Sequence, residues 1–472
     1  MSSVISVPDR PLEWVPAGPA PARDRPGARA AVPASAAPGV ILGAEAGAEA
    51  RQGRLRPAVI RTTTLDSGLR VVTEAMPDVR SVTAGYWVGT GGRDEEAGVV
   101  GASHFLEHLL FKGTPTRSAR SIAEAVDAVG GDMNAFTTKE YTAFYVRVLS
   151  EHLDLGLDVL CDIMWSPSLA PSDLDSERQV ILEEILMHAD EPADLVHELF
   201  STAQFPGHPL GREVLGSEDS IAAMTAEEVR GFFASHYRPA NMVMAAAGDL
   251  EHEAVVKAVE ARFAGLPGGQ GPARTAPVGA PNALAVTTRP TEQAHVVLGV
   301  RGPDRHDPQR WAVAALNHVL GGGLSSRLFQ EIRETRGLAY SVYSDQTSFE
   351  DAGSVAVYVG TSPDRAMAVV DLVTAELDNL VESGITEREL VVAHAHLRAD
   401  TLLALEDSGA RMSRIGQSLL LHGEVLEIAD VLARIEAVTL EEVYQAARDV
   451  LGGPRTLAVV GPFDQSDFAG RP

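Results

Sequence analysis

The chain has 472 residues, enough for two domains of ordinary size, and its hydrophobic content of 45% fits a protein with well-packed cores. Its 39 basic and 65 acidic residues give a formal net charge of −26, which disfavours nucleic acid as a partner and favours neutral or basic partners. A single cysteine, Cys161, excludes an internal disulfide framework and a cysteine-based zinc site.

The N-terminal segment differs in composition from the rest of the chain. Residues 1–57 are rich in Ala, Pro, Gly and Arg and lack apolar periodicity, which predicts a disordered tail, with an organelle transit peptide as the alternative. The sequence contains no run of 18 or more apolar residues, so we expect no membrane span. The basic patch and apolar core of a secretory signal are also missing. We therefore expect a cytoplasmic location and an ordered chain from residue 58.

The first ordered segments alternate between strand and helix patterns. A β-rich run that turns at residues 66–68 predicts a hairpin, and a strand over residues 81–91 and two helices follow it. Residues 132–149, rich in Thr, Tyr, Phe and Val, predict one long strand. Two longer helices are expected between residues 153 and 188, and we expect Cys161 to be buried in the first of them.

A Gly- and Pro-rich stretch, residues 264–284, predicts a linker in the middle of the chain. After it the same order of strand, helix, strand-rich stretch and long helix recurs, and the chain closes on a strand similar to the one that ends the first half. These patterns predict an α+β fold of two similar domains, residues 58–263 and 285–464. Each should be a mostly antiparallel sheet packed with helices, and the two should be related by internal duplication.

The stretch GASHFLEHLLFKGT, residues 101–114, contains two histidines four residues apart. On a helix with 100° per residue, His104, Glu107 and His108 fall within an arc of about 100° and share one face. Two imidazoles so placed can hold one zinc ion, with the glutamate beside it to take a proton from water. Since catalytic zinc has three protein ligands and an open position, the sequence must supply a third ligand.

The best donor region for a third ligand is SERQVILEEILMHADE, residues 176–191. Glu177 and Glu184 share one helix face, whereas Glu183 points elsewhere and His188 returns to the same face as a possible substitute ligand. We prefer Glu184 as the ligand, with Glu177 orienting a ligand or the water. Histidines on a helix are more often surface or packing residues, and acidic residues seven apart are common. The pattern alone therefore leaves ordinary packing open.

From about residue 59 to residue 463 the sequence resembles the pitrilysin-type metallopeptidases. This inverted-zincin family includes mitochondrial processing peptidase, insulin-degrading enzyme and bacterial processing peptidases. Its H-x-x-E-H motif is matched by His104, Glu107 and His108, and its downstream ligand and second functional glutamate by Glu184 and Glu177. The chain is most similar to the short-chain branch, which includes bacterial processing peptidases and the beta subunit of the mitochondrial enzyme.

The resemblance also implies residues that bind the substrate. Asn134 and Ala135 match the edge strand along which the family binds peptides. Arg333 and Tyr340 match an arginine and a tyrosine of the second half, the tyrosine donating a hydrogen bond to the developing oxyanion and the arginine fixing the peptide. An ordinary surface ion pair is the alternative for Arg333. Another histidine, His318, stands alone in an apolar helix, and we expect it to be a packed core residue.

The implied activity is that of a zinc-dependent endopeptidase that cleaves unfolded peptides, or processes N-terminal segments, inside a closed chamber. The net charge of −26 agrees with a preference for basic peptides. Glu107 would act as general base and then general acid. Chains of this length resemble members that pair as homodimers or with a related subunit. A non-catalytic scaffold subunit of the same fold is one alternative, and a metal-free module that binds peptides is another.

Overall fold

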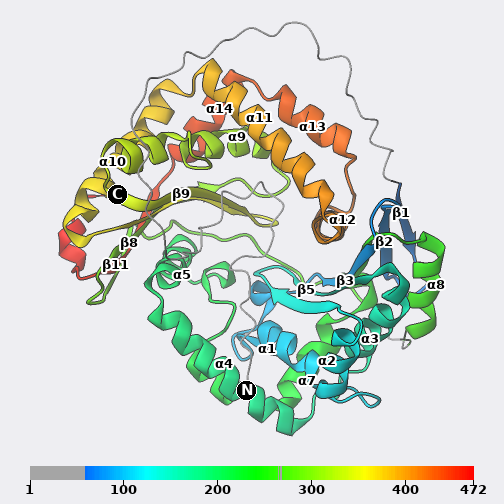
Figure 1. Ribbon diagram of the computed structural model, residues 1–472. Coiled ribbons are helices and arrows are strands. Elements are labelled where there is room, and N and C mark those ends of the chain that lie inside the picture. Colours follow the sequence, from blue (N-terminus) through cyan, green and yellow to red (C-terminus); the bar gives the residue numbers. More distant parts are fainter. Residues whose placement is uncertain (1–58, 264, 266–267, 472) are drawn as a thin grey trace, which may run out of the picture.

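The computed structural model describes residues 59–263, 265 and 268–471, so the predicted tail, residues 1–57, lies outside the described residues. The described chain forms two sheets packed with helices, the first sheet at the lower right and the second at the upper left of Figure 1. The strands of the first sheet are β1 (Ile60–Thr64), β2 (Arg70–Ala75), β3 (Ser81–Val88), β4 (Asp132–Thr137), β5 (Thr142–Leu149) and β6 (Met242–Gly248). Those of the second are β7 (Leu284–Thr288), β8 (Ala294–Gly302), β9 (Ala339–Ser348), β10 (Gly353–Thr361) and β11 (Arg455–Gly461).

The helices fall into two sets, one in each half of the chain. Those of the first half are α1 (Ala102–Leu109), α2 (Ala119–Asp127), α3 (Leu153–Trp165), α4 (Pro171–Asp190), α5 (Pro192–Gln204), α6 (Glu218–Ala223), α7 (Ala226–His236) and α8 (His252–Arg262). Those of the second half are α9 (Arg310–Leu320), α10 (Ala366–Ser383), α11 (Glu387–Leu403), α12 (Ser408–His422), α13 (Ile428–Ala437) and α14 (Leu440–Ala446).

The two sheets repeat one topology. Their strand orders are β1-β2-β6-β3-β5-β4 and β7-β11-β8-β10-β9, so that every strand except β1 has a counterpart. Each sheet contains one parallel pair of neighbouring strands, β2 with β6 in the first sheet and β7 with β11 in the second, and these two pairs occupy equivalent positions. The remaining neighbours are antiparallel. The predicted α+β fold of two mostly antiparallel sheets is confirmed, and the shared strand order supports an internal duplication.

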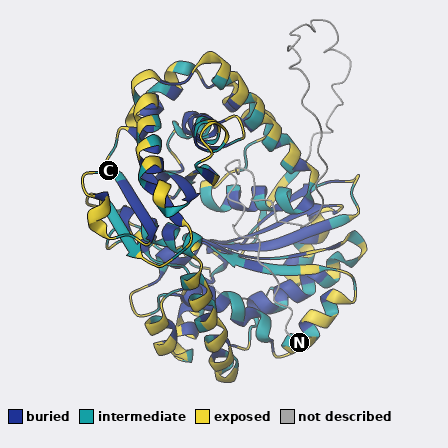
Figure 2. Ribbon diagram, turned by 60° about the vertical axis from the view of Figure 1, so that its left-hand side comes forward, coloured by how far each residue is buried: buried dark blue, intermediate teal, exposed yellow. Residues whose placement is uncertain are grey.

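The central strands are covered on both faces, as their apolar sequences require. In β3 every residue from Val82 to Val88 is buried, and β6 is buried throughout. A strand with helices on both faces reads as a continuous apolar run, which is the pattern of MVMAAAG in β6. Figure 2 shows these dark, buried strands between helices whose outer faces are exposed.

Each half of the chain places one helix on the sheet of the other half. Helix α12 packs on β3 and β6 of the first sheet, and α5 packs on β8 and β11 of the second. Glycines permit both contacts, because a Cβ at Gly416 of α12 would lie 2.4 Å from Nε1 of Trp87, and one at Gly299 of β8 would lie 2.7 Å from Phe200 of α5. The division predicted at residues 264–284 therefore separates the sheets but not the helices that cover them.

The prediction of one long strand over residues 132–149 is wrong, because β4 and β5 form an antiparallel hairpin. The turn contains neither Gly nor Pro, the usual signals of a turn. Instead, Thr138 closes it: its backbone N–H donates to the carbonyl of Tyr141 at 2.8 Å, and its hydroxyl accepts from the backbone N–H of Tyr141 at 3.1 Å. As a result, β4 becomes an edge strand of the first sheet.

Two further expectations concern single features. Cys161 is buried in α3, as predicted, and its Sγ lies 3.3 Å from the hydroxyl of Tyr86. Among the helices of the described residues, none is both long and apolar enough to cross a bilayer.

Candidate metal centre

Helix α1, which carries the histidine pair, is held at its N-terminus by a buried carboxylate. The cap residue Gly101 has φ 94°, a left-handed conformation that favours glycine, and has no side chain to cap the helix. The side chain of Glu95 caps the helix instead, because its two oxygens accept hydrogen bonds from the backbone N–H groups of Gly101 and Ser103, each at 2.7 Å. These bonds satisfy two of the N–H groups that a helix leaves open at its start.

The three residues predicted as ligands lie together in the structure. Oε2 of Glu184, on α4, lies 3.7 Å from Nε2 of His104 and 3.6 Å from Nε2 of His108. Among the described residues these three form the one group whose ligand atoms all lie within 4.8 Å of one another. Glu183 is exposed, as expected, and His188 does not belong to the group.

The spacing of these atoms fits a metal better than direct hydrogen bonds. Separations of 3.6 and 3.7 Å are longer than hydrogen bonds, whereas two ligands of one tetrahedral zinc ion lie about 3.4 Å apart. Burial, aided by the neighbouring His108 and His188, lowers the pKa of His104 to about 3, so this imidazole is in the neutral form that binds metals. Two imidazole nitrogens and a carboxylate oxygen are a donor set that suits zinc.

Glu177 orients the second histidine. One of its oxygens lies 3.2 Å from Nδ1 of His108, and the other accepts from the ammonium group of Lys112 at 2.6 Å. A proton held on Nδ1 leaves the lone pair on Nε2, the atom that faces Glu184. Burial acts to raise the pKa of Glu177, but the hydrogen bonds with His108 and Lys112 outweigh it and lower that pKa. The carboxylate therefore stays ionised beside the imidazole.

Glu107 lies on the same face of α1, where a hydroxyl holds it. Thr137, at the end of β4, donates to Oε2 of Glu107 at 2.6 Å. Burial raises the pKa of Glu107 to about 7, while the hydrogen bond from Thr137 and the nearby His108 act in the opposite direction. A carboxylate with such a pKa is suited to take up and release a proton near neutral pH.

Three of the four predicted substrate residues lie on edge strands of the two sheets, and the fourth, Arg333, lies in the helical segment Phe329–Thr335. Asn134 and Ala135 lie on β4 and Tyr340 lies on β9, the counterpart of β4 in the second sheet. The Tyr340 side chain is exposed, and the guanidinium of Arg333 lies 4.5 Å from its ring centre and donates to its carbonyl at 3.0 Å. Arg333 also lies 3.9 Å from Glu334, at the limit of an ion pair. Within the described residues, no contact links Arg333 or Tyr340 to the histidine pair.

Sequence reasoning missed three side chains that shape this site. Lys112 follows His108 by four residues, a spacing from which its position beside Glu177 could have been inferred. Glu95 and Thr137 carry no such signal, since one comes from a loop and the other from the end of a strand that was predicted to continue.

An acidic pocket of about 470 Å³ adjoins the site. It lies where the C-terminal end of α4 meets α5 and the loop before α6, and its lining includes Ile185 and His188, which follow Glu184 on α4. Its lining contains four carboxylates and no lysine or arginine, and consists of Ile185, His188, Ala189, Leu195, Glu198, Glu213, Leu215, Gly216, Ser217, Glu218 and Asp219.

Known protein families match both halves of the chain. Residues 70–218 match the family described as insulinase (peptidase family M16), and residues 223–396 match the peptidase M16 inactive domain. The chain is 49% identical to an uncharacterised zinc protease of Streptomyces coelicolor, a match that covers 86% of this chain and 90% of that protein. It is 38% identical to an uncharacterised zinc protease of Bacillus subtilis, over 86% of this chain and 98% of that protein.

Solved structures show the same fold. A protease from Helicobacter pylori superposes with a TM-score of 0.81 at 24% identity, covering 86% of this chain and 100% of that one. The similarity to the relatives spans nearly their whole length and both halves of the chain in order. The predicted resemblance is confirmed: the chain belongs to peptidase family M16, the pitrilysin-type family, in its short-chain branch.

Proposed function

We propose that the protein is a zinc-dependent endopeptidase whose metal is held by His104, His108 and Glu184. The observation that carries the proposal is the convergence of their three ligand atoms within 4.8 Å on the helix face that also carries the half-buried Glu107. The relatives from Streptomyces coelicolor and Bacillus subtilis are named zinc proteases, which agrees with this donor set. The stretch that matches the inactive domain of the family, residues 223–396, contains neither the histidine pair nor Glu184.

The side chains divide the chemistry between them. A zinc ion bound here supplies a Lewis acid and lowers the pKa of a coordinated water toward about 7. Glu107 accepts the proton of the attacking water and passes it to the nitrogen of the departing amine, so that the carboxylate is regenerated at the end of the cycle. Glu177, held by Lys112, keeps His108 in the tautomer that presents Nε2.

The surroundings of the site favour an extended, basic peptide. Among the described strands β4 is the edge of the first sheet, so a peptide can add to it as a further strand through main-chain hydrogen bonds, beside Asn134 and Ala135. The four carboxylates of the adjoining pocket attract a lysine or arginine side chain of that peptide. Because only an unfolded segment can add as a strand, the substrate is an unfolded peptide or an exposed N-terminal segment.

A partner subunit completes the site in this proposal. Arg333 holds Tyr340 at the exposed edge of the second sheet, where the tyrosine side chain is 71% exposed and has no contact with the histidine pair within the described residues. A second copy of the chain, or a related subunit, would place its own tyrosine at the metal centre, where the hydroxyl donates to the developing oxyanion. Two subunits facing each other would also enclose the chamber.

Metal analysis together with cleavage of a quenched basic peptide tests the proposal, with and without a chelator. Glu107→Gln should keep bound zinc and lose turnover by about 10²- to 10⁴-fold, whereas His108→Ala should lose both zinc and turnover. Undiminished cleavage after complete removal of metal would contradict the proposal. A zinc-loaded dimer that cleaves no peptide would identify the scaffold subunit instead, and peptide binding without zinc would identify the binding module.

A further inference from the structure

A hydroxyl group fixes the carboxylate that acts as the base. Thr137 Oγ1 lies 2.6 Å from Oε2 of Glu107. In the ionised form, in which Glu107 acts as the base, the carboxylate only accepts hydrogen bonds, so the threonine is the donor. The last torsion of a glutamate side chain is broad and imposes little orientation of its own, so an external donor decides how the carboxylate plane lies.

We propose that Thr137 is a positioning residue for the hydrolytic reaction: it holds one oxygen of Glu107 so that the other oxygen is directed to the water. This inference rests on the proposed function. It adds a group that is not a metal ligand and that contacts Glu107 itself, so that it determines the geometry of proton transfer. Displacement of a reacting group by about 1 Å can cost about 100-fold in rate, so such a contact matters for kcat.

The turn that follows Thr137 is fastened to the neighbouring loop. The backbone N–H of Gly92 donates to the carbonyl of Thr138 at 3.0 Å, and that of Arg93 donates to the carbonyl of Lys139 at 2.8 Å. The ammonium group of Lys139 donates to the carbonyl of Arg212. The end of β4 is therefore held on both sides, although β4 is an edge strand.

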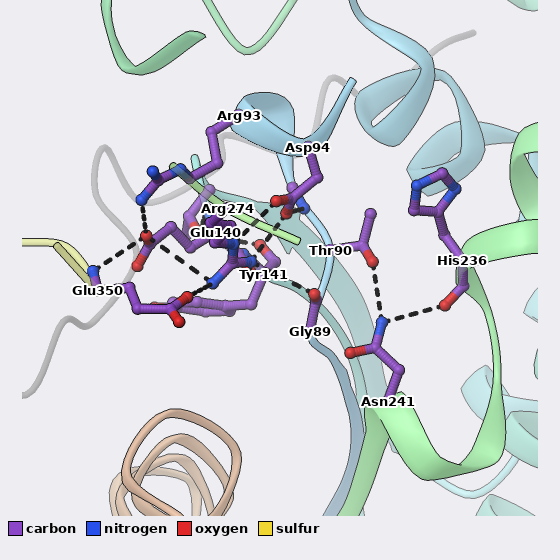
Figure 3. Close-up of polar contacts among 12 residues, drawn as sticks. Gly89, Thr90, Arg93, Asp94, Glu140, Tyr141, His236, Asn241, Arg274 and Glu350 are labelled. Carbon is purple, nitrogen blue, oxygen red and sulfur yellow. Dashed lines mark hydrogen bonds and ion pairs between the residues drawn. The ribbon is translucent and has the colours of Figure 1, made fainter. Parts of the chain in front are cut away.

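Glu140, at the tip of this turn, connects it to the linker and to the second half of the chain (Figure 3). Its side chain is only 2% exposed and pairs with Arg93 at 2.5 Å and with Arg305. Its carbonyl accepts from Arg274 of the linker at 2.6 Å, and its carboxylate accepts from the backbone N–H of Glu350 at 3.1 Å. The position of the Thr137 hydroxyl thus depends on a buried contact between the two halves.

Paired substitutions test the inference on the zinc-loaded protein with the quenched basic peptide. Thr137→Val removes the hydroxyl and keeps the shape, and should lower kcat by about 10- to 100-fold with KM within about twofold and the zinc content unchanged. Thr137→Ser restores a hydroxyl and should recover most of the lost kcat. Thr142→Val is the matched control, because Thr142 lies opposite Thr137 in the hairpin and its hydroxyl donates to the carbonyl of Thr90 instead.

Two results overturn the inference. The first is an equal kcat for the unmodified protein and the Thr137→Val variant, when the unmodified protein is active. That result would refute the positioning role and leave the proposed function intact. The other comes from crystal structures, which need no activity: a Glu107 carboxylate that keeps its orientation in the Thr137→Val variant refutes the positioning role. A reoriented or disordered carboxylate supports it, even if the unmodified protein cleaved no peptide and the proposed function failed.

Discussion

Replacing Glu140 by alanine should destabilise the protein strongly. The carboxylate lies among three guanidinium groups, with side-chain exposures of 2% for Arg93, 7% for Arg305 and 10% for Arg274. Removing one partner of a buried ion pair costs about 3–5 kcal/mol, because the remaining charge stays out of water without compensation. Arg93 keeps a bidentate contact with Asp351, both distances 3.0 Å, so we expect a loss near the lower limit, about 3 kcal/mol.

Urea unfolding followed by tryptophan fluorescence measures this loss. Glu124→Ala is the matched control, because Glu124 pairs with Arg120 one helical turn away, and both side chains are largely exposed. An exposed pair of this kind contributes about 0.3–0.5 kcal/mol, so the control should unfold almost as the unmodified protein does. A Glu140→Ala variant within about 1 kcal/mol of the unmodified protein would refute the reasoning, because the buried cations would then have found other compensation.

Three further predictions follow from contacts elsewhere in the chain. Glu177→Gln should weaken zinc binding about 10- to 100-fold in a competition titration, because it disturbs the orientation of His108. Glu183 is exposed, so the control variant Glu183→Gln should bind zinc as the unmodified protein does. Gly416→Ala should lower the free energy of unfolding by about 1–3 kcal/mol, because the added Cβ meets Trp87. Gly231→Ala should raise the free energy of unfolding by up to about 1 kcal/mol, because Gly231 lies in an open position of α7. Burial acts to raise the pKa of Glu389, but the hydrogen bonds with Arg327 and Thr386 outweigh it and lower that pKa from 4.5 to about 2. The ionised carboxylate therefore stabilises the fold above pH 4.5, and this contribution is lost as the pH falls toward 2. The unfolding midpoint should therefore fall less steeply over that range in Glu389→Gln.

The candidate site could be predicted to the extent that it depends on helical periodicity. His104, Glu107 and His108 share a face because of their spacing, and so do Glu177 and Glu184. Periodicity does not say that α1 and α4 pack together, and here that step came from the resemblance to a known family. The structure then places both histidine Nε2 atoms near Glu184, at 3.7 and 3.6 Å.

Features that depend on tertiary contacts could not be predicted from the sequence. The turn at residues 138–141 has no Gly or Pro, and its Glu140 side chain pairs with arginines more than 40 residues distant in the chain. The contact between Thr137 and Glu107 depends on the packing of β4 against α1, which lie apart in the sequence. The apolar stripes of α5 and α12 predict burial but do not name the sheet that buries them, so the exchange of these helices between the halves could not be foreseen.

The second half shows why the function has to be argued from side chains rather than from the fold. Helix α9 follows β8 as α1 follows β3, and α9 packs against α11 as α1 packs against α4. Helix α9 carries a single histidine, His318, which is buried, as expected, and stacks on His396 of α11 with ring centres 4.1 Å apart and planes inclined by 21°. Stacked rings present their faces to one another, so their nitrogen lone pairs do not converge as those of His104 and His108 do toward Glu184. The two halves share a scaffold, and the ability to hold a metal follows from a few residues placed on one copy of it.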